Sequence, residues 1–176
     1  TSGTRPILRF FAGDLDPGLC ESPDMIEQAY AQGVPMGGTL SQSQQPPRFL
    51  VSVQKDSGTL ESPGTDIQRV QIIKGWVDSA GDSHEKVFDI AGDANNGAGV
   101  DEQSCARVGQ GMQQSCAVWS DAEFAAGQDA FYYVRIVENP SCRWSTLQCQ
   151  ADGVNPFSND CSAQADAATL RAQAKG

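Results

Sequence analysis

Runs of apolar residues with a period of two predict a chain built mainly from β-strands. In the strand expected at 68–78, Ile72 and Ile73 are adjacent and therefore point to opposite faces of the strand. Apolar residues on both faces favour a central position in a sheet, and the turn that follows at 78–82 favours an antiparallel hairpin. Further strands are predicted at 7–11, 48–54, 84–90, 116–119 and 130–138.

One helix is expected near the N-terminus, at 23–32. Ser22 is suited to cap it, Pro23 to occupy its first turn, and Gly33 to end it in a left-handed conformation. A stripe of side chains with spacings of three and four residues should pack inward, formed by Met25, Ile26, Ala29 and Tyr30.

Two stretches interrupt the strand pattern. Residues 92–114 are rich in Gly, Asn and Asp, and beyond 147 the sequence becomes rich in Ala, Gln, Ser and Asp. We predict a mainly β chain, an antiparallel β-sandwich at 1–147 with one short N-terminal α-helix and a long irregular loop region stapled by a disulfide. An irregular, weakly helical tail is predicted at 148–176.

The composition of the chain narrows the classes of molecule that it could bind. Asp and Glu number 22 against 12 Lys and Arg, so the net charge of −10 repels nucleic-acid backbones and anionic lipids. The sequence contains no run of about 18 apolar residues, which argues against membrane insertion. It also begins without an initiator Met or an apolar signal core, so we expect the chain to be a processed product, a cloned domain or a proteolytic fragment of a larger protein.

Six cysteines at irregular spacing, with no Cys-x-x-Cys pair and a single histidine, favour disulfides over zinc. The sequence therefore predicts an oxidising compartment, either periplasmic or extracellular. Cys105 and Cys116 enclose a Gly-rich loop and are the favoured pair. Spacing does not decide the pairing of the other four, which are Cys20, Cys142, Cys149 and Cys161.

One segment carries the side chains of a calcium site. Its oxygen donors are Asp93, Asn95, Asp101 and Glu102. The spacing departs from that of an EF-hand loop, since Ala98 and Ser104 stand where Gly and Glu are needed. A solvated loop in which Asn and Asp form turns explains the segment better. We expect no cofactor, with calcium as the one ion left open.

No catalytic residues are predicted. His84 is the only histidine, so the second histidine that a zinc-protease motif requires one helical turn later is missing. Trp76 and Trp119 lie in expected strands and are interpreted as core residues. Trp144 lies beyond the last strand and is the candidate for an exposed ligand contact, such as stacking against a sugar.

Three segments carry a resemblance to a known family. They are Gly33-Val-Pro-Met-Gly-Gly38, Val70-Gln-Ile-Ile-Lys-Gly-Trp-Val-Asp78 and Phe131-Tyr-Tyr-Val-Arg-Ile-Val-Glu-Asn-Pro-Ser-Cys-Arg-Trp144. In their residues and in their order along the chain, they resemble the C-terminal region of the bacterial domain-of-unknown-function 3604 family. The glycines of the first segment are interpreted as a structural turn that passes close to another backbone.

The resemblance implies a function for the chain. Members of the family look like secreted proteins whose N-terminal part is similar to the polymerase-and-histidinol-phosphatase (PHP) class of metal-dependent hydrolases. We therefore expect a non-catalytic C-terminal β domain whose partner is the PHP-like N-terminal portion of the same parent protein. The alternative is a self-sufficient secreted binding module for a glycan or calcium.

Overall fold

The structure is a computed structural model that describes residues 4–41, 43–102 and 104–154. Its strands pair antiparallel throughout, which confirms the prediction of a mainly β chain. Two α-helices accompany the described strands, where the sequence predicted one. In the described ranges, every helix is too short or too polar to cross a bilayer.

Contacts divide the chain into two compact units. The sandwich unit comprises Thr1–Asn96 and Gly111–Glu138, and the C-terminal unit comprises Gly97–Gln110 and Asn139–Gly176. This division departs from the predicted boundary between residues 147 and 148, because the segment Gly97–Gln110 groups with the C-terminal residues.

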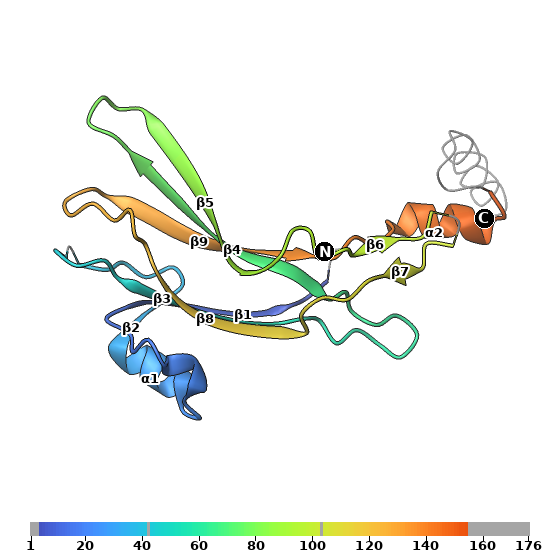
Figure 1. The fold of residues 1–176 in the computed structure, drawn as a ribbon, viewed down its shortest axis with the longest axis horizontal. Coiled ribbons are helices and arrows are strands. Elements are labelled where there is room, and N and C mark those ends of the chain that lie inside the picture. Colours follow the sequence, from blue (N-terminus) through green and yellow to red (C-terminus); the bar gives the residue numbers. More distant parts are fainter. Residues whose placement is uncertain (1–3, 42, 103, 155–176) are drawn as a thin grey trace, which may run out of the picture. The chain divides into compact units, whose positions relative to one another are not determined.

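The sandwich unit contains two sheets (Figure 1). The four-stranded sheet has the order β2 (Gly33–Pro35), β1 (Ile7–Gly13), β3 (Arg48–Gln54) and β8 (Gln114–Ser120). The three-stranded sheet has the order β5 (Ser83–Gly92), β4 (Ile67–Val77) and β9 (Ala130–Glu138). The central position predicted for the strand at 68–78 is therefore confirmed for β4. The bounds of β3 and β9 agree with the predicted ones at both ends.

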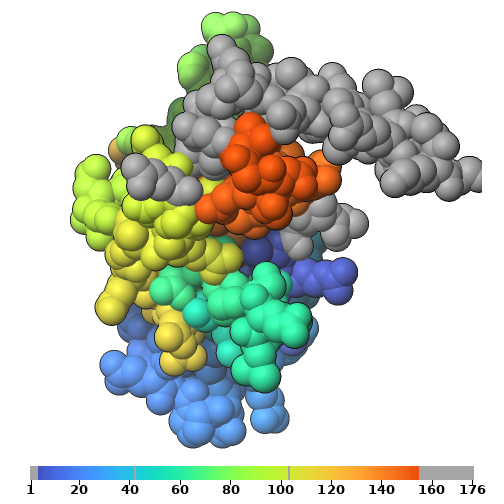
Figure 2. Space-filling model, turned by 90° about the vertical axis from the view of Figure 1, so that its right-hand side faces the viewer, coloured from blue at the N-terminus to red at the C-terminus, as the bar shows by residue number. Residues whose placement is uncertain are grey.

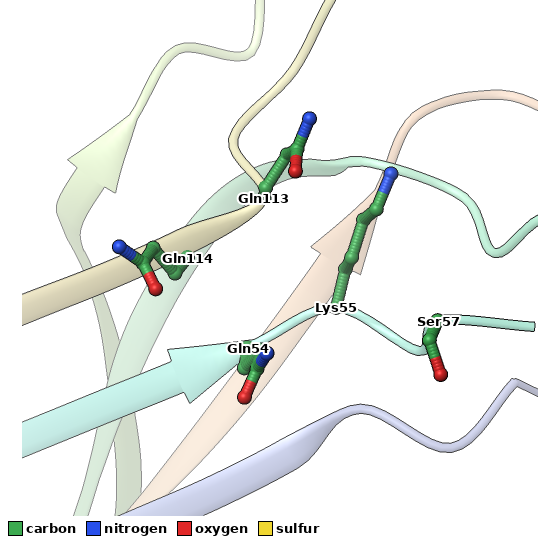
Figure 3. A pocket seen from close by; sticks show the side chains of 5 residues that line it. All are labelled: Gln54, Lys55, Ser57, Gln113 and Gln114. Carbon is green, nitrogen blue, oxygen red and sulfur yellow. The ribbon is translucent and has the colours of Figure 1, made fainter.

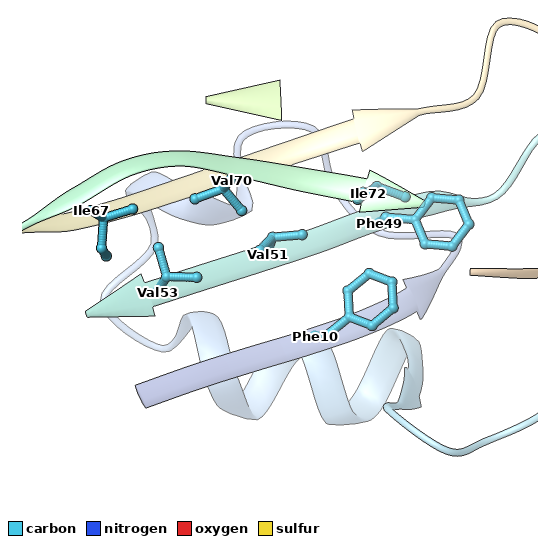
Figure 4. Close-up of a cluster of buried hydrophobic side chains, with 7 residues drawn as sticks. All are labelled: Phe10, Phe49, Val51, Val53, Ile67, Val70 and Ile72. Atoms are coloured by element: carbon cyan, nitrogen blue, oxygen red, sulfur yellow. The ribbon is translucent and has the colours of Figure 1, made fainter. Parts of the chain in front are cut away.

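The main core lies between the two sheets (Figure 4). The four-stranded sheet contributes Phe10, Phe49, Val51 and Val53, and β4 contributes Ile67, Val70 and Ile72. Each such side chain stabilises the fold by roughly 1.5–3 kcal/mol when fully removed from water. The shared core makes the two sheets a sandwich, as the sequence predicted.

A second core covers the opposite face of the four-stranded sheet. Neighbouring residues Phe10 and Phe11 point to opposite faces of β1, and Phe11 enters this second cluster. The cover consists of the short 3-10 helix η1 (Leu19–Glu21) and the helix α1 (Met25–Gln32). The buried residues of the cluster are Phe11, Leu15, Leu19, Ala29 and Leu50.

Helix α1 begins two residues later than predicted. Its N-cap is Asp24, whereas Ser22 stands in the preceding turn and its Oγ accepts hydrogen bonds from the Asp24 amide and the Gln28 side chain. The predicted inward stripe is buried at Ala29, but Tyr30 is 56% exposed and contacts Phe11 with its ring edge-on.

Gly33 ends helix α1 for a different reason from the one predicted. Its backbone is extended, with φ −150° and ψ −173°, so it is not a left-handed C-terminal residue. A Cβ atom at Gly33 would lie 2.6 Å from the carbonyl oxygen of Ala12 on the neighbouring strand. Close approach to another backbone, the interpretation of the Gly-Val-Pro-Met-Gly-Gly segment, is therefore confirmed.

Three elements of the C-terminal unit were not predicted. Strands β6 (Gly99–Val100) and β7 (Arg107–Val108) form a short hairpin in the stretch expected to be irregular. Helix α2 (Trp144–Ala151) spans the predicted start of the tail, and residues 155–176 of that tail lie outside the described residues.

The predicted disulfide between Cys105 and Cys116 is wrong. Cys20 is bonded to Cys116, with their Cα atoms 5.7 Å apart, and Cys105 is bonded to Cys142, with their Cα atoms 5.9 Å apart. The two predicted partners belong to different units, because pairing of β8 with β3 places Cys116 in the sandwich unit. Cys149 is also disulfide-bonded, and Cys161 lies outside the described residues.

Peptide mapping of the unreduced protein should link Cys20 with Cys116 and Cys105 with Cys142. The double substitution Cys20→Ala with Cys116→Ala should lower the free energy of unfolding, because it removes a cross-link between residues 96 positions apart. The chain-entropy model gives about 4–5 kcal/mol for a closure of this length, measurable by denaturant unfolding. Recovery of a peptide that joins Cys105 to Cys116 would contradict the observed pairing.

Candidate functional site

The most deeply buried charges of the described chain form an ion pair between the two sheets. Lys74 Nζ lies 2.6 Å from Asp121 Oδ2, and the two side chains are 4% and 0% exposed. Lys74 comes from β4, and Asp121 directly follows β8. Lys74 also donates to the carbonyl of Glu123 at 3.0 Å.

Both carboxylate oxygens of Asp121 accept further hydrogen bonds. The Tyr132 hydroxyl donates to Oδ2 at 2.8 Å, and the Glu123 amide donates to Oδ1 at 2.8 Å. Tyr132 reaches this point because it is the register partner of Lys74 across β4 and β9. We call Lys74, Asp121 and Tyr132 the buried ionic cluster. Its hydrogen bonds compensate for the cost of removing two charges from water.

The local sequence explains why the cluster stands where it does. Val70 and Ile72 of β4 point into the main core, and the period of two directs Lys74 to the same face. A lysine at that position needs a buried partner, which the chain supplies only 47 residues later in Asp121. The aromatic rings of Trp76 and Tyr132, whose centroids lie 5.3 and 5.9 Å from Lys74 Nζ, add cation–π attraction.

The surroundings of the cluster shift the pKa values of Asp121 and Tyr132 in opposite directions. Burial raises the pKa of Asp121, but the hydrogen bonds from Lys74, the Glu123 amide and Tyr132 outweigh burial and leave that pKa below its ordinary value. Burial, together with the neighbouring Asp121 carboxylate, raises the pKa of Tyr132. Asp121 is therefore ionised and Tyr132 neutral near pH 7. The pair holds the two sheets together by a hydrogen bond and is not suited to exchange protons with a substrate.

His84 packs in the hairpin formed by β4 and β5. Its ring stacks on Trp76 with centroids 5.2 Å apart and planes inclined by 18°. Its Nε2 lies 2.7 Å from Asp78 Oδ2, and hydrogen bonding to His84 is the largest cause of the lowered pKa of Asp78. Asp78 Oδ1 in turn accepts the amides of Ala80 and Asp82, so this histidine belongs to the construction of the turn.

The tryptophans do not form one aromatic platform in the sandwich unit. Trp119 packs between Phe49 and Phe88, and Trp76 is covered by His84. Trp144 stands at the first turn of α2 in the C-terminal unit and is 72% exposed. Its predicted role in ligand contact stays a prediction.

Two of the candidate calcium donors, Asp93 and Asp101, accept hydrogen bonds within their own turns. Asp93 Oδ1 accepts the Asn95 amide at 2.8 Å, and Asp101 Oδ1 accepts both the amide and the hydroxyl of Ser104 at 2.7 Å. Asp93 and Asn95 belong to the sandwich unit, whereas Asp101 and Glu102 belong to the C-terminal unit. Among the described residues, no three His, Cys, Asp or Glu side chains are grouped so that they could hold a metal ion. Calcium binding is therefore still only a prediction.

A polar hollow of about 330 Å³ lies where β3 ends and β8 begins (Figure 3). The loop that follows β3, coloured teal in Figure 2, lies at the molecular surface and contributes Ser57 to the lining of the hollow. Small-molecule sites are usually lined by apolar and aromatic residues with a few polar ones, whereas every residue that lines this hollow is of a polar type. Its lysine is also paired with Asp66 at 2.6 Å. The lining residues, none of which the sequence singled out, are Gln54, Lys55, Ser57, Gln113 and Gln114.

Comparison with known families agrees with the resemblance found in the sequence motifs. The family model described as a protein of unknown function (DUF3604) matches residues 1–170. The chain belongs to the DUF3604 family. No curated protein and no solved structure matches it. Family membership of this DUF3604 chain therefore gives no activity, and its function has to be argued from its own residues.

Breaking the buried ionic cluster of this DUF3604 chain should destabilise it strongly. Lys74→Met leaves Asp121 as a buried carboxylate without its cation and should lower the free energy of unfolding by about 3–5 kcal/mol. Adding Asp121→Asn to Lys74→Met removes the orphaned charge and should recover part of that loss. Denaturant unfolding of the three proteins measures both effects. A double variant no more stable than Lys74→Met would contradict the ion-pair explanation.

The cluster also predicts a pH dependence. Because the pKa of Asp121 is lower in the folded chain than its unfolded value of about 3.9, the unfolded chain binds the proton first as pH falls. The stability from Asp121 is therefore complete above about pH 5 and is lost as pH falls through the folded pKa. The difference in unfolding free energy between wild type and Asp121→Asn should shrink over that acidic range. A difference that stays constant down to about pH 2 would contradict this assignment.

Proposed function

We propose that this chain is a non-catalytic β domain of a larger secreted protein, whose remaining part is a PHP-like metal-dependent hydrolase. The supporting observation is that the buried ion pair and the single histidine of the chain are engaged in structural contacts. Lys74 and Asp121 neutralise each other between the sheets, and His84 is held between Trp76 and Asp78. A general base or nucleophile needs a free reacting atom in a cleft, and these groups do not offer one.

The cysteines support the same proposal. All described cysteines are in disulfides, so they provide no thiolate nucleophile. Disulfides form and persist in oxidising compartments, which is compatible with a periplasmic or extracellular location. In the proposed arrangement the cross-links stabilise a rigid domain that packs on the hydrolase portion or presents a substrate to it.

A second candidate function is binding of a glycan by a self-sufficient module. The observation that favours it is the 72% exposure of Trp144, since an exposed indole offers an apolar face on which a sugar ring can stack. Retardation of the chain in a gel that contains a soluble polysaccharide, abolished by Trp144→Ala, would favour this candidate. Retardation that persists in Trp144→Ala would remove it.

The isolated chain is expected to be inert toward phosphomonoesters, phosphodiesters, simple esters and glycosides under conditions in which the longer parent protein is active. The reason is the engagement of its ionisable groups described above. Both proteins should be assayed side by side, with His84→Ala in the parent as a control that is expected to leave turnover unchanged. Turnover by the isolated chain that survives repurification and is abolished by a point substitution within it would contradict the proposal.

A further inference from the structure

The outer face of the three-stranded sheet, turned away from the main core, is unusually apolar for a solvent-facing surface. Alternation along the strands assigns residues to this face, since Val70 and Ile72 of β4 and Val134 of β9 pack in the core. The outer face consists of Arg69, Gln71, Ile73, Gly75 and Val77 of β4, Ser83, Glu85, Val87 and Asp89 of β5, and Phe131, Tyr133 and Arg135 of β9.

Several large side chains on this face are exposed. Val77 is 56% exposed, Val87 40%, Phe131 62% and Tyr133 39%, while Ile73 lies fully buried among them. The rings of Phe131 and Tyr133 have planes within 14° of each other, with centroids 6.2 Å apart. Phe131 lies over Gly75, because a Cβ atom there would be 2.2 Å from Phe131 Cζ. Contiguous apolar patches of this kind mark interaction sites.

Charged residues border the patch in an ordered way. The strand register places three residues in each row across the sheet: Glu85, Gly75 and Phe131; then Val87, Ile73 and Tyr133; then Asp89, Gln71 and Arg135. The two carboxylates thus stand on β5, and Arg135 stands on β9, on the other side of β4. Arg69 of β4 lies beyond the row of Gln71, and its Nε is 3.6 Å from Asp89 Oδ1. Gln71 lies between Asp89 and Arg135 and hydrogen-bonds to both at 2.7 Å.

We propose that a second copy of this chain covers the outer face, related to the first by a two-fold axis parallel to β4. Such an axis exchanges left and right but keeps each row in place, so β5 of one copy lies over β9 of the other. Asp89 then faces Arg135 of the second copy, and Val87 faces Tyr133 of the second copy. Each contact occurs twice, as two-fold symmetry requires. This inference is independent of the accessory role proposed above.

The charges select this axis over the other face-to-face arrangement. A two-fold axis perpendicular to the strands would lay β5 over β5 and reverse the order of the rows. Glu85 would then face Asp89 of the second copy, twice, and like charges juxtaposed at an interface oppose association. Sheets that pack face to face keep their strands within about 30° of alignment, which preserves the facing of the central rows.

The small area of the patch limits the affinity of the dimer. Three strands about 4.8 Å apart and the three rows named above, about 6.8 Å apart, cover about 300 Å² on each copy. Stable interfaces bury about 800 Å² on each partner, so this dimer is weak. The net charge of −10 on each copy also opposes association, although salt screens it beyond about 8 Å at physiological ionic strength. For a dimer weaker than a stable complex we expect a dissociation constant between about 10 µM and 1 mM.

Sedimentation equilibrium of the full 176-residue chain at about 0.15 M salt, from about 1 µM to 1 mM, tests the proposal. Wild type should pass from monomer to dimer within this range. Asp89→Arg and Arg135→Asp should each raise the dissociation constant at least about tenfold, because each variant places like charges in both facing pairs. Arg9→Asp, an exposed site on the four-stranded sheet, is the matched control and should dimerise as wild type does.

The decisive measurement mixes the two variants. A heterodimer of Asp89→Arg with Arg135→Asp restores opposite charges at both facing pairs, so the mixture should dimerise with a constant within about threefold of wild type. Thermal unfolding of each variant checks that it is folded. A wild-type chain that stays monomeric throughout would overturn the proposal and leave the outer face to another part of the parent protein. A wild-type dimer that the mixture fails to restore would overturn it equally, since the copies would then meet elsewhere.

Discussion

The sandwich unit depends on the ion pair of Lys74 with Asp121, which holds the two sheets together at the point where the apolar core ends. A buried charge is tolerated only with a partner and with its remaining hydrogen-bonding capacity satisfied. This requirement explains the tyrosine on the core face of β9, whose hydroxyl completes the shell of Asp121. It also distinguishes registers that the hydrophobic pattern does not. A slip of β9 by two residues would keep every side chain on its own face but would separate Tyr132 from Asp121.

Those parts of the fold that rest on alternation were predictable. Strands β3 and β9 have long, uninterrupted runs, and the adjacent Ile72 and Ile73 correctly indicated a central strand. The start of the helix was not, because Ser22 and Pro23 satisfy the rules for a helix N-terminus and for a preceding turn equally well. Gly33 satisfies the rule for a helix end, but a steric contact with Ala12, 21 residues away in sequence, is what requires it.

The site was less predictable because its members meet only in the folded chain. A lysine within the apolar run of β4 is a sequence sign of a buried charge, but nothing near it in sequence identifies Asp121 as its partner. The disulfides fail for the same reason. Cys105 and Cys116 are close along the chain, whereas sheet pairing and the 3-10 helix bring Cys116 to Cys20. The sequence showed apolar residues on both faces of β4. It did not show that the outer face of the three-stranded sheet is exposed, because this depends on whether another described element covers that face.

The path of the chain between β8 and β9 carries one more consequence. These strands are consecutive in sequence but belong to different sheets, so the chain crosses the sandwich directly after Asp121. Neither sheet is a continuous stretch of polypeptide, and the crossing is tied at its start by Lys74 and near its end by Tyr132. The two sheets therefore form a single cooperative folding unit. Backbone amides of the central strands on both sides should exchange their hydrogens with solvent through one common global opening, not through separate openings of each sheet.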